Sequence, residues 1–185
     1  MKNISLLFYC LLCPLHAVSD NANVDLSHLK TQLAQHKKDL PQGSLQDRRH
    51  VKKLIDILYV FDQSFRQSIM QNCHKDTAHG ALLKECDAFH TSIMKDILQI
   101  YPWIVISKFG PEYDHKAWLL VQHADHDPGF QYDILLLLQQ LVKCNETNKK
   151  NVAYLYDRVA IKNHALGMRQ KYGTQVNITK DGIQL

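Results

Sequence analysis

The densest group of polar side chains in the sequence lies at residues 122–127, which read Gln-His-Ala-Asp-His-Asp. Histidine and aspartate can ligate a divalent metal ion, and both can act as general acids or bases. His123 and Asp125 could share a metal ion or a proton, although their spacing matches no standard zinc motif. A hydrogen-bonded structural pair is the alternative. Asp127, which precedes Pro128, is expected to cap a helix.

A second candidate is Asp62, because it interrupts an apolar stripe that Ile55, Leu58 and Phe65 form at helical spacing. A buried carboxylate is costly unless it is paired, hydrogen-bonded or protonated. Arg66 follows one helical turn later on the same face and is the predicted partner. The pair could serve a reaction, or it could be a structural ion pair at the edge of the core.

A third candidate is the dipeptide Asp157-Arg158, which sits in a predicted helix. Asp157 shares a face with mainly apolar residues, and neighbouring side chains point apart on a helix. Both residues therefore need partners from elsewhere in the chain. Residues 172–175 place hydrogen-bonding groups around a glycine just beyond this helix, which indicates either a site segment or a tight turn.

Motifs and composition narrow the classes of function. The sequence has no GxSxG, HExxH, phosphate-loop or dinucleotide-binding motif. The formal net charge is only +4 and the basic residues are scattered, so no nucleic-acid partner is expected. A length of 185 residues suits one domain, and 7 Gly and 5 Pro favour helices over a many-turned β-sandwich.

Helical periodicity predicts the elements that must position these side chains. Apolar residues recur at helical spacing over about residues 26–33, 51–69, 82–97, 111–124, 128–141 and 152–166. Residues 103–106 are β-branched and apolar and could form an extended connection, and turn residues at 180–182 allow a short C-terminal β-hairpin. We therefore expect an all-α fold: a compact single-domain bundle of five to six helices.

Residues 1–19 have the layout of a secretory signal peptide, with a basic start, an apolar run at 4–15 and small residues at Ala17 and Ser19. The run is shorter than the roughly 20 apolar residues that span a bilayer. A buried N-terminal helix is the alternative. We expect an exported protein, periplasmic or secreted, in which residues 20–185 form one helical domain without a membrane span.

Three cysteines follow the predicted signal peptide, namely Cys73, Cys86 and Cys144. A disulfide between Cys73 and Cys86 would close a short loop and suits an oxidising compartment. The alternative is that all three are small buried apolar residues.

Three strings occur in order: WLLVQHAD at 118–125, AYLYDRV at 153–159 and QKYGTQ at 170–175. Over about residues 50–176 the chain resembles a bacterial family of uncharacterised helical domains whose hallmarks are QHAD, DRV and YGTQ. His90 departs from that pattern, where a smaller polar residue is expected. The resemblance implies a fold and a site rather than a reaction. The site positions that it implies are Gln122, His123, Asp125, Asp157, Arg158, Tyr172, Thr174 and Gln175.

Our first hypothesis is an exported hydrolase that acts on a small molecule or a polymer. His123 would be the general base or a metal ligand, and Asp125 would orient it or share the metal. Asp62 and Asp157 would supply further carboxylates. The residues expected to bind the substrate are Arg66, Gln122, Arg158, Tyr172, Thr174 and Gln175.

The second hypothesis is a noncatalytic binding or host-interaction protein, in which the polar cluster is a buried network that fixes the packing of the helices. A third is a structural domain that depends on a metal ion. Exposure of the cluster separates the first two hypotheses, because an enzyme needs His123 at an accessible surface.

Overall fold

The computed structural model describes residues 25–72, 77–162, 166–175, 177–179 and 182–184. These residues contain seven α-helices, so the predicted all-α class is confirmed and the predicted helix number is low by at least one. The helices are α1 (Leu26–Lys38), α2 (Arg48–Asn72), α3 (Thr77–Ile100), α4 (Ile106–Phe109), α5 (Pro111–Gln122), α6 (Pro128–Leu141) and α7 (Lys149–Lys162). A 3-10 turn (Val142–Cys144) follows α6.

The helix that sequence periodicity missed is α4, a single turn where an extended connection was expected. The N–H of Phe109 donates to the carbonyl of Val105, and the N–H of Gly110 donates to that of Ile106. Gly110 then has φ +93°, a conformation that favours glycine and ends the turn. One turn is too short to produce a periodic pattern, which explains the error.

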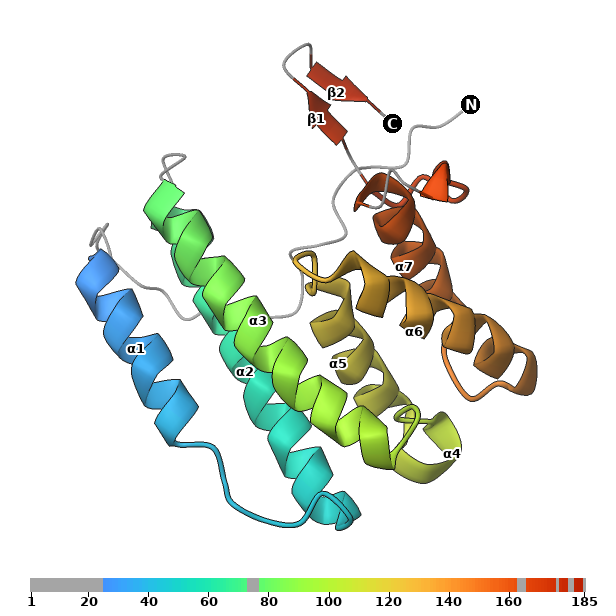
Figure 1. The fold of residues 1–185 in the computed structure, drawn as a ribbon, viewed down its shortest axis with the longest axis horizontal. Helices are drawn as coiled ribbons and strands as arrows, with labels where there is room; N and C mark the ends of the chain where they lie inside the picture. Colours follow the sequence, from blue (N-terminus) through green and yellow to red (C-terminus); the bar gives the residue numbers. More distant parts are fainter. Residues whose placement is uncertain (1–24, 73–76, 163–165, 176, 180–181, 185) are drawn as a thin grey trace, which may run out of the picture.

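Helix α5 occupies the centre of the fold (Figure 1). Helices α1, α2 and α3 run side by side, and α5 packs against both α2 and α3. On its other side α5 contacts α6 and α7, which pack against each other. The C-terminal end of α5 is therefore surrounded by elements from both halves of the chain.

The junction of α5 and α6 has clear local causes. Pro111 occupies the first turn of α5, with Glu112 and Asp114 near its positive end. The Asp127 side chain accepts a hydrogen bond of 3.0 Å from the N–H of Phe130, so the predicted helix cap is confirmed. The two helices are separated by a tight turn, which brings residues 123–127 to the end of the bundle.

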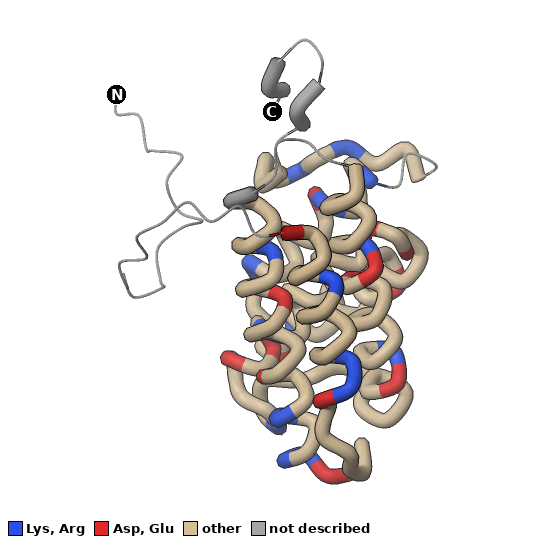
Figure 2. Tube along the Cα trace, turned by 90° about the vertical axis from the view of Figure 1, so that its left-hand side faces the viewer, with Lys and Arg blue, Asp and Glu red and all other residues tan. Residues whose placement is uncertain are grey.

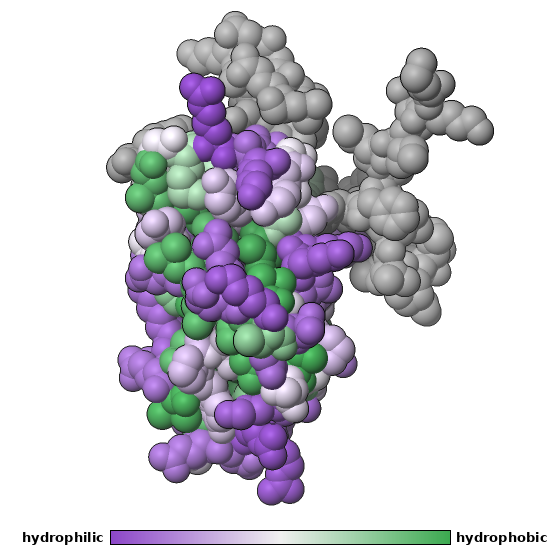
Figure 3. Space-filling view, turned by 90° about the vertical axis from the view of Figure 1, so that its right-hand side faces the viewer, coloured by the Kyte–Doolittle hydropathy of each residue, from purple (hydrophilic) through white to green (hydrophobic). Residues whose placement is uncertain are grey.

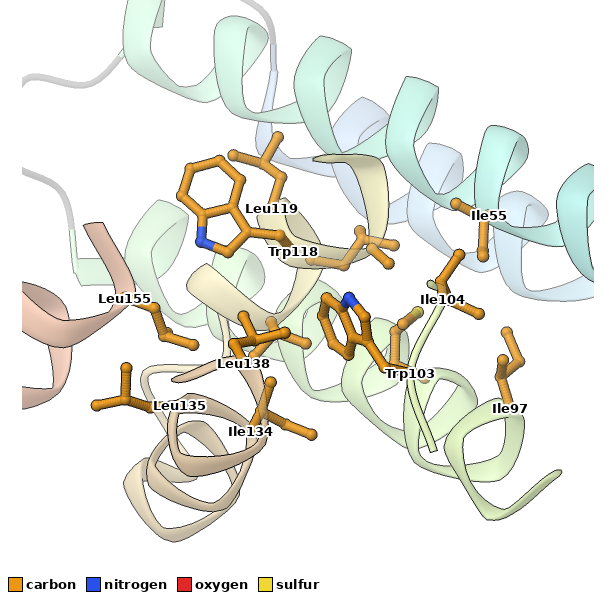
Figure 4. Packing of buried hydrophobic residues seen from close by; sticks show 14 of the residues in the cluster. Ile55, Ile97, Trp103, Ile104, Trp118, Leu119, Ile134, Leu135, Leu138 and Leu155 are labelled. Atoms are coloured by element: carbon orange, nitrogen blue, oxygen red, sulfur yellow. The ribbon is translucent and has the colours of Figure 1, made fainter. Parts of the chain in front are cut away.

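The main core lies between α2, α3, α5, α6 and α7. Trp103 and Trp118 pack in it among branched aliphatic side chains such as Leu138 (Figure 4). Fully burying one such side chain contributes about 1.5–3 kcal/mol, so this cluster stabilises the arrangement around α5. A smaller core joins α1 to α2 and α3 and consists of Leu29, Leu33, Phe65, Ile69, Leu82 and Cys86.

The C-terminal segment contains two short strands, β1 (Asn177–Thr179) and β2 (Gly182–Gln184). They pair antiparallel, with Ile178 opposite Ile183. Each has three residues, so the pair adds no layer to the helical fold and the class remains all-α.

The surface carries mixed charge and scattered apolar side chains. Acidic and basic residues are interspersed over the helices in Figure 2, and polar side chains interrupt the apolar ones on the face shown in Figure 3. The most exposed large apolar residues, Val60 and Met70, are separate positions along α2. Within the described residues no helix is long and apolar enough to cross a membrane. Residues 1–19, the predicted signal peptide, lie outside the described residues.

Candidate functional site

Asp62 and His123 form a carboxylate–imidazole pair. Asp62 lies on α2 with its side chain only 1% exposed, and His123 caps the C-terminal end of α5. His123 Nδ1 is 3.0 Å from one carboxylate oxygen of Asp62 and 3.1 Å from the other. Long-range packing of α5 on α2 makes this contact, because the two residues are 61 positions apart.

Arg66 connects this pair to a third carboxylate. Its Nε lies 3.1 Å from Asp62 and 2.9 Å from His123 Nδ1, and its Nη2 donates to Asp87 on α3. Nε and one Nη form the side edge of the guanidinium fork, so Asp62, His123 and Asp87 lie along one edge of a single cation.

Asp87 is a site residue that sequence reasoning missed. It is one turn from Leu83 and His90 and two turns from Met94, so it interrupts the apolar face of α3 as Asp62 interrupts that of α2. Its side chain is 11% exposed. The same stripe argument that identified Asp62 would have found Asp87.

The side chains of Asp62, His123 and Asp87 have very different proton affinities. Burial opposes ionisation of Asp62, but its contacts with His123 and Arg66 outweigh burial and lower its pKa to about 2. Burial lowers the pKa of His123, although Asp62 partly offsets this effect. Burial raises the pKa of Asp87 to about 7, and the charge of Arg66 only partly counteracts it. Near neutral pH, Asp62 is ionised, His123 is neutral and Asp87 is partly protonated.

The two partners of Nδ1 favour opposite tautomers of the imidazole. With the proton on Nδ1, neutral His123 donates to ionised Asp62, and with the proton on Nε2, Nδ1 accepts from Arg66 Nε. Nε2 makes no hydrogen bond to a described residue and is not one of the buried polar atoms without a partner. The His123 side chain is 17% exposed, so the tautomer with the proton on Nδ1 leaves an unprotonated Nε2 on a partly exposed ring.

Asp125 is paired with arginine rather than with His123. Arg158 Nε and Nη2 each donate to Asp125 over 2.7 Å, and Lys162 lies 3.2 Å from the same carboxylate. Arg158 Nη1 also donates to Gln175 over 3.2 Å. The charges of Asp125 and Arg158 act on the pKa of Asp87, so this second group is an electrostatic neighbour of the first.

A metal ion shared by His123 Nδ1 and Asp125 finds no support in this geometry. The His123 Nδ1 atom faces Asp62 and Arg66, and the carboxylate of Asp125 is occupied by two cations. In the part of the chain that is described, no group of three or more His, Cys, Asp or Glu side chains could hold a metal ion.

Asp157 is fully buried and holds the segment that carries the YGTQ string. It accepts hydrogen bonds from the backbone N–H groups of Lys171, Tyr172 and Thr174 over 2.7 to 3.1 Å, and from the hydroxyl of Thr174 over 2.9 Å. Burial opposes its ionisation, yet these donors outweigh burial and lower its pKa. Gly173, with φ +64°, permits the turn that brings these donors together.

The remaining predicted substrate-binding residues are more dispersed. The Gln122 side chain contacts α7, where its Nε2 is 3.5 Å from the Tyr154 carbonyl. The Tyr172 side chain is partly exposed and packs edge to face on Tyr156. Gln131, which lies on α6, donates to the carbonyls of residues 121 and 122 over 3.1 Å and fixes the end of α5.

Asp114 is a further buried carboxylate that sequence reasoning missed. Its side chain accepts from Trp103 Nε1 (2.8 Å), Thr147 Oγ1 (2.7 Å), the Asn148 N–H (3.0 Å) and Asn151 Nδ2 (2.9 Å). Four donors that do not titrate near neutral pH surround it completely. This arrangement ties α5 to the connection before α7.

The predicted Cys73–Cys86 disulfide stays a prediction, because Cys73 lies outside the described residues. Cys86 and Cys144 are free thiols in the structure. Cys86 is buried beside His90, and His90 Nε2 lies 2.9 Å from His36 Nε2 on α1. Burial raises the pKa of the Cys86 thiol and lowers the pKa values of His36 and His90, to about 4 and about 3.

Comparisons with known proteins identify a family. Residues 51–185 match the Family of unknown function (DUF6624). No curated protein and no solved structure matches the chain. The matched segment begins after α1 and includes the residues that form the site.

Proposed function

The chain belongs to this family of unknown function, and we propose that it is a hydrolase in which His123 is the general base. The observation that carries the proposal is the Asp62–His123 pair, in which a buried carboxylate contacts Nδ1 of a partly exposed imidazole and Nε2 makes no hydrogen bond to a described residue. Burial lowers the pKa of His123 below the ordinary histidine value, so the imidazole is neutral at neutral pH, and we assign its proton to Nδ1, which leaves Nε2 as the base.

The proposed reaction uses water as the nucleophile. His123 Nε2 takes a proton from a water molecule as its oxygen attacks the substrate, and Asp62 stabilises the imidazolium that forms. The imidazolium then returns the proton to the leaving group. Arg66 Nη1, which makes no hydrogen bond to a described residue, is available to bind an anionic group of the substrate.

The other predicted site residues hold the segments next to the Asp62–His123 pair in place. Asp125 and Arg158 neutralise each other and fix the turn after His123, with Gln175 as an additional partner of the arginine. Asp157 holds the segment that carries Gln175. We assign these residues to positioning and keep substrate contact for Arg66 and the exposed part of Tyr172.

We also propose that the protein is exported, on the basis of the layout of residues 1–19. N-terminal sequencing of the protein recovered from periplasmic and extracellular fractions tests this. A mature N-terminus at residue 20 supports export, whereas an intact Met1 in the cytoplasm contradicts it.

A screen of ester, amide, glycoside and phosphodiester substrates with the wild type and His123→Ala tests the hydrolase proposal. General base catalysis contributes about 10²–10⁴-fold, so the variant should lose that factor in turnover. His126→Ala is the matched control, because His126 is exposed in the same turn. Equal activity of the wild type and His123→Ala would contradict the role of His123.

A noncatalytic binding protein is the second candidate, and the shape of the surface favours it. Two hollows of about 570 and 430 Å³ are not lined by His123; one is lined by Arg48 and Tyr101 among others, and the other by His36 and Phe61 among others. If the polar groups only fix helix packing, His123→Ala should lower the melting temperature and no substrate of the screen should be turned over.

A further inference from the structure

We infer that protonation of Asp87 controls whether Arg66 can bind a compact oxyanion such as a sulfate or phosphate group. The inference rests on the proposed function only in taking Arg66 as the group that receives the anionic part of the substrate. It adds a residue that the proposed reaction does not use, and it specifies a substrate that carries a small oxyanion.

The geometry of the guanidinium allows such a ligand. Nε of Arg66 is directed to Asp62 and His123, and Nη2 is directed to Asp87. No described residue accepts a hydrogen bond from Nη1, and the side chain is 18% exposed. The end of the fork, formed by Nη1 and Nη2, can bind two oxygens of one oxyanion, and Asp87 stands beside that end.

The charges around Asp87 explain why its proton matters. Asp62 and Arg66 face it from α2, Asp125 from the turn after α5 and Arg158 from α7. Ionised Asp87 and Asp62 leave Arg66 with two negative charges for one positive charge. An oxyanion would add a third, whereas protonation of Asp87 restores a balanced pair.

The group formed by Asp125, Arg158 and Lys162 does not alter this balance of charges around Arg66. Asp125 is bound by both Arg158 and Lys162, so that group has one positive charge in excess and favours an anion nearby. Histidine neighbours do not compensate either, because burial lowers the pKa values of His90 and His123 and keeps both neutral. The proton of Asp87 is therefore the variable that changes near neutral pH, since burial raises its pKa to about 7.

Sulfate is the probe, because its charge does not change across the neutral range. We would titrate the folded chain with sodium sulfate at constant ionic strength between about pH 6 and pH 8.5, and follow calorimetric heat and the side-chain ¹⁵N resonances of Arg66 and His123. Above the pKa of Asp87 the fraction of protonated carboxyl falls about tenfold per pH unit, so the sulfate affinity should fall by up to the same factor.

Asp87→Asn should bind sulfate with an affinity that no longer depends on pH in this range, because the amide mimics the protonated carboxyl. Asp96→Asn is the matched control, since Asp96 lies on the exposed side of the same helix, and it should keep the wild-type pH dependence. Arg49→Gln controls for binding to exposed basic residues, because the Arg49 side chain is 95% exposed.

Absence of sulfate binding, or a pH dependence that Asp87→Asn leaves unchanged, would overturn the inference. Sulfate binding requires no turnover, so a failure of the hydrolase proposal leaves this result standing. Turnover by a wild type that binds no sulfate would contradict only the inference about Asp87 and Arg66.

Discussion

Asp114 and Asp62 are equally buried, yet their surroundings differ in kind. Asp114 receives four hydrogen bonds from an indole, a hydroxyl, an amide and a backbone N–H, none of which titrates near neutral pH. Asp62 faces Arg66, His123 and the Gln63 amide. The imidazole beside Asp62 can change its protonation and its tautomer, whereas no partner of Asp114 titrates near neutral pH.

The difference separates a structural carboxylate from a reactive one. A carboxylate whose partners are all uncharged donors contributes to stability and offers no second group to exchange a proton with. A carboxylate beside an imidazole and a second carboxylic acid forms part of a set whose protons can move, and perturbed pKa values of this kind cluster at functional sites. The region around α2, α3 and the end of α5 is therefore where chemistry is expected.

The largest effect should come from Asp114→Asn. The new NH₂ group would face either the Trp103 indole N–H or the Asn148 backbone N–H, neither of which can accept, so at least one buried hydrogen bond would be lost and the others would lose the charge of their acceptor. We expect a loss of about 3–5 kcal/mol in the free energy of unfolding, measured by urea denaturation. Asp133→Asn on the exposed side of α6 is the control and should change stability by less than about 0.5 kcal/mol. If Asp114→Asn lowered the free energy of unfolding by as little as the control does, Asp114 would not be a structural carboxylate of this kind.

Asp87→Asn should change stability in the opposite direction. A folded-state pKa that burial raises from 3.8 to about 7 means that ionisation of Asp87 opposes folding. Protonated Asp87 therefore contributes fully to the stability of the folded state below about pH 4. This contribution is lost as the pH rises through about 7. The variant should therefore exceed the wild type by about 1–3 kcal/mol at pH 8 and match it near pH 4. Denaturation curves at both pH values measure this, and a variant that is less stable at pH 8 would contradict the assigned direction.

How much of this could be read from the sequence differs between local and long-range features. The Asp62–Arg66 pair spans one helical turn and the Asp127 cap spans three residues, so local rules sufficed for both. Proximity in sequence also suggested that His123 acts with Asp125, but the end of α5 directs these two side chains to different helices. Their partners are 61 and 33 positions away, and a local pattern contains no information on such contacts.

Asp62→Asn sharpens the comparison because it makes the same chemical change as Asp114→Asn. His123 can shift its proton from Nδ1 to Nε2 and accept at Nδ1, and Gln63 can turn its amide, so the new Asn finds partners. We expect a cost of about 1–2 kcal/mol, clearly below that of Asp114→Asn. Without the carboxylate the pKa of His123 should also fall further, which ¹⁵N NMR titration of the imidazole would detect. A loss as large as that of Asp114→Asn would mean that the two sites are alike.

The smallest expected effect concerns α1, which packs beside the Asp62 region through His36. Burial lowers the pKa of His36 from 6.5 to about 4 and that of His90 to about 3, so both are neutral when α1 is packed. Their contribution to stability is complete above pH 6.5 and is lost as the pH falls toward 4, because released histidines bind protons that packed ones cannot.

At about pH 5 the packing of α1 should be weaker by about 1–2 kcal/mol, so its amides should exchange hydrogen about tenfold faster than at pH 7 after correction for intrinsic rates. His36→Phe should reduce this acid sensitivity, since the new ring can stack on Phe61 as the imidazole does. His28→Phe on the exposed side of α1 should leave it unchanged. The amides around Asp114 should show no comparable acceleration of exchange, because its hydrogen-bond donors do not titrate in this range. Faster exchange there would mean that acid destabilises the whole fold rather than the packing of α1.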